Sequence, residues 1–323
     1  MDYTSGYVIL DDHYNIFVQG GAAAVDHGTA NLNTMWGAGN GTDKGWGQTG
    51  NLSTVSAGST ISATQWASLL NRMNTIADHT NSSITAITNP TTGDDIEAYA
   101  ALSTNISTLW GNRGDAHASG TDITTNGTMS GTSSWQVSAI GTKTVSFSSN
   151  NAADYFFNAG GMIRISLSRS GGTANNKNTE WTDLLSKVGT IAITGGALIQ
   201  SIAGTNYTGT TKVGGSGTAN IHLTTTGWHD LTAGAGYTTV YRQYADTAPY
   251  TGNYIDISIR KDAAADAIDI RVRLFDTETD SDPVLDIVDG TLLCNVVVRP
   301  PSTTHISNTW GTPTMGASSW AYT

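Results

Sequence analysis

The sequence predicts an α+β protein: a small N-terminal helical region followed by a mainly antiparallel β-sandwich or jelly-roll domain with one packed helix. Two patterns predict this class. Apolar residues recur at helical spacing through about the first 115 residues, and from about residue 118 they alternate with polar residues, as in strands with one buried face. The 37 glycines and the low share of charged residues, 13%, suit turns and short strands. We therefore divide the chain into residues 1–117 and 118–323.

The strongest helical signal lies in "STISATQWASLLNRMNTIADHTN", residues 59–81. Ser62 is placed to cap this helix, and Gln65 follows at the spacing of a capping box. The three- and four-residue spacing that follows defines an amphipathic helix. Its apolar stripe contains Trp66, Leu69, Leu70, Met73, Ile76 and Ala77.

Two more helices are expected in the N-terminal region. One begins near Asp94 or Asp95 and ends at Gly111, a typical helix stop. A shorter one is expected within residues 10–21, and the glycine-rich stretch 36–51 is expected to form a loop anchored by its tryptophans. The inward positions of the helix that ends at Gly111 are Ile96, Tyr99, Ile106, Leu109 and Trp110.

Alternating polarity predicts the strands of the second region. The clearest segments are "TKTVSFS" at 142–148, "MIRISLS" at 162–168, "YIDISIRK" at 254–261 and "AIDIRVRLFD" at 267–276. "NAGG" at 158–161 is predicted to connect a strand at "DYFF" to the strand that follows, as a hairpin. Cys294 is expected at a buried strand position.

One helix is predicted among these strands, within "NTEWTDLLSKVG" at 178–189. Thr179 is the expected cap, and Gly189 is the expected stop.

Aspartate and glutamate alternate at the end of one predicted strand, in "DTETDSDPVLD". Asp276, Glu278, Asp280 and Asp282 resemble the opening of an oxygen-ligand cation site. The segment lacks the glycine and the closing glutamate of an EF-hand loop. The alternative is an acidic hairpin tip between strands at 267–275 and 284–289.

Motifs for other chemistry are absent from the sequence. The seven histidines form no HxH or HExxH pattern, and the nearest pair, His222 and His229, is predicted to flank a turn. Hydrolase and nucleotide-binding motifs are missing. The net charge of −11 disfavours a nucleic-acid surface. We therefore expect no catalysis and no cofactor, and we interpret "RGD" at 113–115 as an exposed polar linker.

Several aromatic residues outside the apolar stripes are candidates for contact with a glycan or a partner protein. They are Trp228, Trp310, Trp320, Tyr237, Tyr241 and Tyr244. The N-terminus lacks the pattern of a signal peptide, and no stretch is long and apolar enough to span a bilayer.

Five segments in a fixed order carry a resemblance to a known family. They are "GWGQ" at 45–48 and the segments 59–73, 154–172, 176–191 and 288–301. Together these segments resemble a family of virion structural proteins of tailed phages, particularly phages of marine cyanobacteria. The resemblance implies that the protein is built into a virion in the host cytoplasm, as a fibre-like subunit of the tail, neck or baseplate. It implies no catalysed reaction. Residues 20–44 and the stretch after the second predicted helix depart from the family pattern, so the position in the particle stays open.

If the family resemblance holds, we expect the helical region to attach the protein to symmetry mates or to a neighbouring virion protein, and the β domain to project outward. By family analogy we expect a homotrimer that also contacts other virion proteins. The predicted assembly residues are Trp66, Leu69, Leu70, Met73, Ile76, Ile96, Tyr99, Ile106 and Trp110. The alternative is a host-recognition module that binds a cell-surface glycan through Trp228, Tyr237, Tyr241 and Tyr244. A third possibility, a glycan depolymerase, requires two carboxylates about 5 to 10 Å apart across a cleft.

Overall fold

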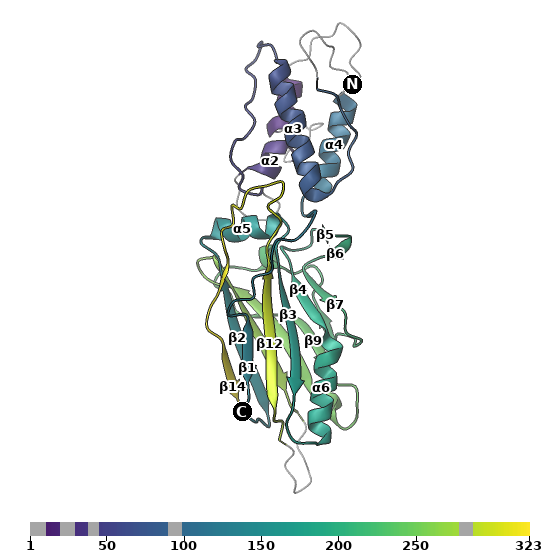
Figure 1. Ribbon diagram of the computed structural model, residues 1–323, viewed down its shortest axis with the longest axis vertical. Helices are drawn as coiled ribbons and strands as arrows, with labels where there is room; N and C mark the ends of the chain where they lie inside the picture. The colour runs from purple at the N-terminus through teal and green to yellow at the C-terminus, as the bar shows by residue number, and fades with distance from the viewer. Residues whose placement is uncertain (1–10, 20–29, 38–44, 90–98, 278–286) are drawn as a thin grey trace.

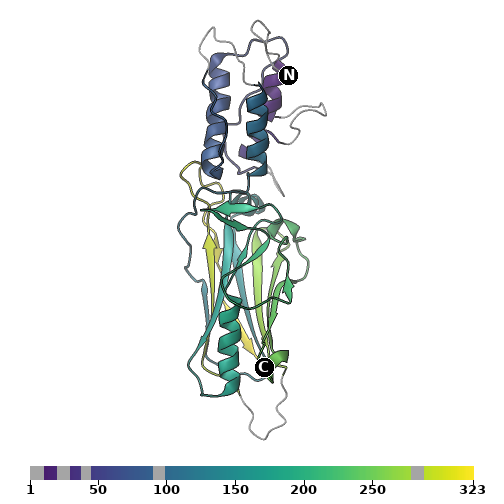
Figure 2. The ribbon, with the colours of Figure 1, turned by 90° about the vertical axis from the view of Figure 1, so that its right-hand side faces the viewer.

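The computed structural model describes residues 11–19, 30–37, 45–89, 99–277 and 287–323. The molecule is elongated, with helices at one end and a β sandwich at the other (Figures 1 and 2). Its sheets are antiparallel, so the predicted α+β class is confirmed. Among the described helices, none combines the length and apolar character that a bilayer crossing requires.

The helical end confirms the main sequence prediction. Its elements are α1 (Asp11–Gln19), α2 (Leu32–Trp36), α3 (Ala63–Thr80) and α4 (Tyr99–Gly111). α3 begins with the predicted capping box: Gln65 N donates to Ser62 Oγ at 3.3 Å, and Ser62 N donates to Gln65 Oε1 at 2.8 Å. α4 ends at Gly111 as expected, whereas its predicted start at Asp94 or Asp95 lies outside the described residues.

The sandwich consists of two antiparallel sheets, with β3 at the centre of one and β11 and β10 at the centre of the other. The five-stranded sheet has the order β1 (Thr128–Gly131), β12 (Thr291–Arg299), β3 (Met162–Ser170), β4 (Thr190–Ile193) and β7 (Thr210–Val213). The second sheet has the order β13 (Thr314–Met315), β2 (Ser138–Ser146), β11 (Ala267–Phe275), β10 (Tyr254–Lys261), β9 (Thr238–Tyr244) and β8 (Ile221–His222), and β14 (Ser319–Tyr322) also pairs with β2. A separate pair joins β5 (Gln200–Ile202) to β6 (Thr205–Tyr207).

The alternating residues of the strands face inward as predicted. In β10, Ile255, Ile257 and Ile259 are fully buried, and the register places them beside inward residues of β11. Cys294 is fully buried in β12, where burial raises the pKa of its thiol to about 12. The inner faces of the two sheets therefore form the core of the sandwich.

The predicted hairpin at "DYFFNAGG" is wrong, because "DYFF" lies in helix α5 (Asn150–Asn158). Ser149 caps this helix by accepting a hydrogen bond from Ala152 N at 3.1 Å. The helix buries Ala152, Ala153, Phe156 and Phe157, which is a helical stripe. The periodicity of such a short apolar run does not distinguish a strand from a helix. Here the Ser149 cap marks the start of a helix.

Helix α6 (Asn176–Val188) runs along the side of the sandwich (Figures 1 and 2). Its existence and its stop at Gly189, with φ of 70°, were predicted. The predicted cap, Thr179, is wrong: Asn175 caps the helix by accepting from Asn178 N at 2.7 Å. Thr179 lies one turn inside, and its hydroxyl donates back to Asn175 O at 3.0 Å.

Candidate functional sites at the junction and on the outer sheet face

The "GWGQ" segment joins the helical end to the sandwich. Trp46 is 1% exposed, and its Nε1 donates to Asn158 O at the end of α5 at 3.1 Å. Its ring lies 4.6 Å from the ring of His79, near the end of α3. Gly47 has a φ of 68°, and a Cβ there would lie 2.4 Å from the ring of Tyr155. A single indole therefore packs between both parts of the molecule.

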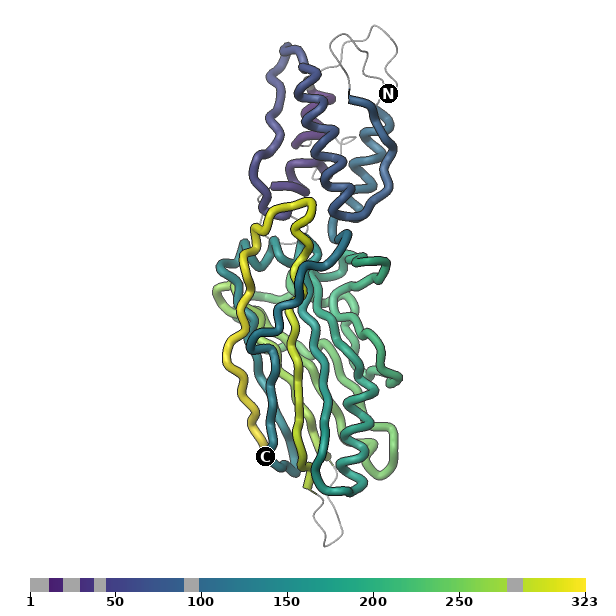
Figure 3. Tube along the Cα trace, in the orientation of Figure 1, coloured from purple at the N-terminus to yellow at the C-terminus, as the bar shows by residue number. Residues whose placement is uncertain are grey.

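The C-terminal segment completes this junction. After β12 the chain rises to the helical end and then runs back along the sandwich to β14 (Figure 3). At its turning point Ser307 N donates to Gln48 Oε1 at 2.9 Å, and Gln48 Nε2 donates to Ser307 O at 2.8 Å. This paired hydrogen bond holds the returning segment against the "GWGQ" loop.

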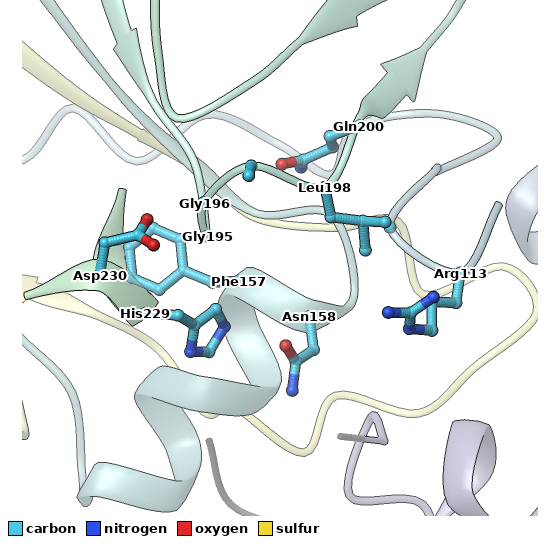
Figure 4. Close-up of a pocket in the computed structure, with 11 residues that line it drawn as sticks. Arg113, Phe157, Asn158, Gly195, Gly196, Leu198, Gln200, His229 and Asp230 are labelled. Atoms are coloured by element: carbon cyan, nitrogen blue, oxygen red, sulfur yellow. The ribbon is translucent and has the colours of Figure 1, made fainter. Parts of the chain in front are cut away.

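A polar cavity of about 270 Å³ lies beside the junction. Its polar side chains come from Arg113, Asn158, Gln200, His229 and Asp230. Figure 4 shows Arg113 on one side of the cavity and His229 and Asp230 on the other, with Asn158 between them. The opposed charges suit a small polar group, held between a guanidinium and a carboxylate.

Glycines allow the wall of this cavity to approach closely. A Cβ at Gly196 would lie 2.8 Å from Asp230 Oδ2, and a Cβ at Gly195 would lie 3.1 Å from the ring of His229. Asp230 also accepts from Gly227 N at 2.9 Å, which fixes its carboxylate. The cavity wall therefore has no room for side chains at Gly195 and Gly196, and one backbone hydrogen bond holds the Asp230 carboxylate.

The "RGD" segment is part of this wall, so its prediction as an exposed linker is wrong. Arg113 is 9% exposed, and its guanidinium lies 3.9 Å from the centre of the Trp110 ring. Asp115 accepts from Ser201 N at 2.6 Å, and burial raises the pKa of its carboxyl. These contacts order the chain between α4 and the sandwich.

The second candidate site is the outer face of β9, β10 and β11, which we name the arginine–aromatic face. It contains Arg242, Arg260, Arg271, Arg273, Tyr237, Tyr244, Tyr254 and Phe275. Alternation along the strands places these side chains on the side opposite the isoleucine core. The face is half-buried, with single exposed positions such as the Arg260 side chain at 44%.

A buried carboxylate organises this face. Asp256 is fully buried, and Arg242 donates to it from Nε at 2.5 Å and from a second guanidinium nitrogen at 2.8 Å. Arg273 donates to the same carboxylate from the opposite strand. The carboxylate raises the pKa of Arg242. Because two arginines surround one aspartate, this group of three side chains carries a net positive charge.

Aromatic rings support the remaining guanidinium groups. Arg260 and Arg271 lie 4.6 and 4.1 Å from the centre of the Tyr237 ring. Tyr254 stacks on Phe275 at 5.2 Å, and Arg242 lies 4.5 Å from the Tyr254 ring. Arg271 has no ion pair with a carboxylate among the described residues. The face is thus rigid, aromatic and positive within an acidic protein.

Only part of the predicted glycan set lies on a surface. Trp228 and Tyr241 are fully buried, which excludes them as contact residues in this fold. Trp228 lies between Phe157, stacked at 5.4 Å, and Lys261, whose Nζ is 4.1 Å from the ring centre. Tyr237 and Tyr244 are half-buried on the arginine–aromatic face. Trp310 is also buried, and Trp320 is half-buried against the core.

The predicted assembly residues lie mostly inside the chain's own core. Trp66, Leu69, Leu70, Met73, Ile76 and Ile106 are at most 3% exposed. Tyr99 and Trp110 are half-buried, and Ile96 lies outside the described residues. A contact with another chain would use other residues of these helices, and attachment through the helical region stays a prediction.

The predicted cation site at the acidic segment is described only at its first residue. Asp276 is 6% exposed, and its Oδ2 lies 3.0 Å from Lys177 Nζ on α6. Glu278, Asp280 and Asp282 lie outside the described residues. His222 and His229 each contact other groups: His222 Nε2 lies 2.8 Å from Thr210 O, and His229 Nδ1 lies 3.7 Å from Asp154.

Sequence reasoning missed the arginine–aromatic face, although part of its signal was present. Asp269, Arg271, Arg273 and Phe275 occupy alternate positions on one predicted strand, opposite its apolar face. What was missing is the strand pairing that brings Asp256 opposite Arg273 and Arg242.

Searches of known protein families, of characterised proteins and of solved structures found no match to this chain.

Proposed function

We propose that this protein is a structural subunit of a tailed-phage virion, in its tail, neck or baseplate, which acts by protein–protein assembly without catalysis. The observation that carries this proposal is the arginine–aromatic face. Arginine, tyrosine and phenylalanine are the residue types enriched at protein interfaces. Here they form one surface of a sheet whose other surface is the core.

The face is also preorganised for contact. Arg242 and Arg273 are held by Asp256, and Arg260 donates to Asp269 at 2.8 Å. A side chain already fixed by an ion pair or a ring loses little conformational entropy when a partner binds. Such a surface suits repeated contacts between rigid subunits.

The elongated shape fits the same role. The helical end and the sandwich lie at opposite ends, so one end can attach while the other projects (Figure 1). The virion setting rests on the family resemblance of the five sequence segments, and so does the homotrimer. The sandwich's positive face and the net charge of −11 also allow one copy to approach another through opposite charges.

Light scattering on the purified full-length chain tests the assembly proposal. We expect a mass of three chains, and we expect Arg271→Glu to reduce it, because reversal removes a positive group without breaking an ion pair among the described residues. Lys212→Glu on β7 of the other sheet is the matched control and should leave the mass unchanged. A monomeric mass for the wild-type chain would argue against the homotrimer. Equal masses for the two variants would argue against the arginine–aromatic face as the assembly surface.

A second candidate function is recognition of an acidic host-surface glycan on the same face. It is favoured by Tyr237 and Tyr244, which remain half-buried beside the arginines. Assembly is favoured over it because Arg260 and Arg271 already cover the Tyr237 ring, which leaves less ring surface for a sugar. Binding of a sulfated or carboxylated polysaccharide that Tyr244→Ala abolishes, with no change in mass, would favour recognition.

A further inference from the structure

Glu180 on α6 is a buried carboxylate with an unsatisfied oxygen. The residue is 6% exposed, and its Oε1 has no hydrogen-bond partner among the described residues. An isolated buried carboxylate is costly unless it is protonated or lies against a cation. This position therefore needs an explanation beyond packing.

Two more carboxylates lie beside it. Asp183 follows one turn later on α6, and Asp246 comes from the segment after β9. One oxygen from each of Glu180, Asp183 and Asp246 lies within 4.8 Å of the other two. Because calcium–oxygen bonds are about 2.4 Å long, oxygens at this separation can all coordinate one ion.

One lysine already enters this cluster. Lys187 Nζ lies 2.5 Å from Asp183 and 2.7 Å from Asp246. Hydrogen bonds to Asp183 and then to Asp246 raise the pKa of Lys187. With all groups ionised, three carboxylates and one ammonium carry a formal charge of −2, so the cluster attracts a divalent cation even while the ammonium is in place.

We propose that Glu180, Asp183 and Asp246 form a calcium site that links α6 to the segment after β9. The site is closed on the Glu180 side and open to solvent on the other, because the Asp183 and Asp246 side chains are 40% and 62% exposed. Calcium suits it better than magnesium, since calcium accepts irregular carboxylate geometry and completes its shell with water. Binding displaces the Lys187 ammonium from the two aspartates.

Calorimetric titration of chelator-treated full-length protein with CaCl₂ tests this site, together with the melting temperature at each concentration. We expect saturable binding and a rise of about 5 °C at a hundredfold excess over Kd. Glu180→Gln and Asp246→Asn should each weaken calcium binding at least roughly tenfold. Because the Asp246 side chain is exposed, Asp246→Asn does not alter a buried residue. Lys187→Met should tighten binding roughly tenfold, because it removes the competing positive charge.

Asp78→Asn, on the exposed side of α3, is the matched control and should leave binding unchanged. The variants also separate this site from the acids at 276–282, which they do not alter. A wild-type chain without response up to about 10 mM Ca²⁺ would overturn the proposal. So would wild-type affinity in both Glu180→Gln and Asp246→Asn, and an equal response to Mg²⁺ would overturn the assignment to calcium.

Discussion

His79 is a fully buried histidine at the junction of the two parts. Its Nε2 donates to Ala159 O at 3.0 Å. Burial lowers its pKa from 6.5 to about 4, partly opposed by the hydrogen bond to Ala159, and the nearby His305 and His117 lower it further. The folded chain therefore holds this imidazole neutral at pH values where the unfolded chain protonates it.

Stability should consequently fall as the pH drops from 6.5 toward 4, because only the unfolded state binds the proton in that window. The pKa shift corresponds to a loss of roughly 3 kcal/mol of unfolding free energy between these two pH values. Urea unfolding at pH 7 and near pH 4 measures it. His79→Gln keeps a hydrogen-bond donor but does not titrate, so its pH dependence should be shallower by that amount. Identical pH dependence in both proteins would contradict the prediction.

At the scale of elements, the start of α6 depends on which residue caps it. Asn175 accepts from Asn178 N, whereas Thr179 is exposed and bonds backward to Asn175 O. The cap also holds the helix beside Asp289, which accepts from Asn178 Nδ2 and from Thr173 N. The position of the cap thus sets where α6 meets the end of the sandwich.

Asn175→Ala should cost about 1 kcal/mol of unfolding free energy, the usual loss for a helix cap. Thr179→Ala should change it by less than about 0.5 kcal/mol, because an exposed helical threonine contributes little. Chemical denaturation of the two variants compares them directly. A larger loss for Thr179→Ala would show that the cap is placed incorrectly.

At the scale of the whole molecule, one large apolar core runs from α1 to β13, and a smaller cluster around Met162 lies apart from it. The large core includes Tyr14 and Leu70 in the helical end, Trp46 at the junction and Val272 in the sandwich. Continuous burial couples the two parts, because neither can unfold without exposing apolar surface of the other.

We therefore expect a single calorimetric unfolding transition for the wild-type chain. Trp46→Ala should remove about 3 to 5 kcal/mol of unfolding free energy and split the transition in two, because the buried indole packs against groups of both parts. Trp36→Ala is the control: Trp36 lies within the helical end, against Arg72 at 3.8 Å, so its loss should leave one transition. Two transitions in the wild type would refute this coupling.

Local signals in the sequence were sufficient for several of the longest elements. The capping box at Ser62 and Gln65 defined α3, and period-two alternation defined β3, β10 and β11 almost to the residue. These predictions held because each depends on neighbours within a few residues. The helix at "DYFF" was missed because its apolar run carries no strong period, and Ser149 was not recognised as a cap.

The sequence by itself determined the α+β class, the helical period of α3 and α6, and the buried face of β3, β10 and β11. Only the tertiary structure decided which polar groups meet. Asp256 lies between Arg242 and Arg273, and Glu180 lies beside Asp246, through strand order and helix packing. Alternation specifies the face on which a side chain lies but not its neighbour across the sheet. Sites made from distant segments therefore appear only when the chain is folded.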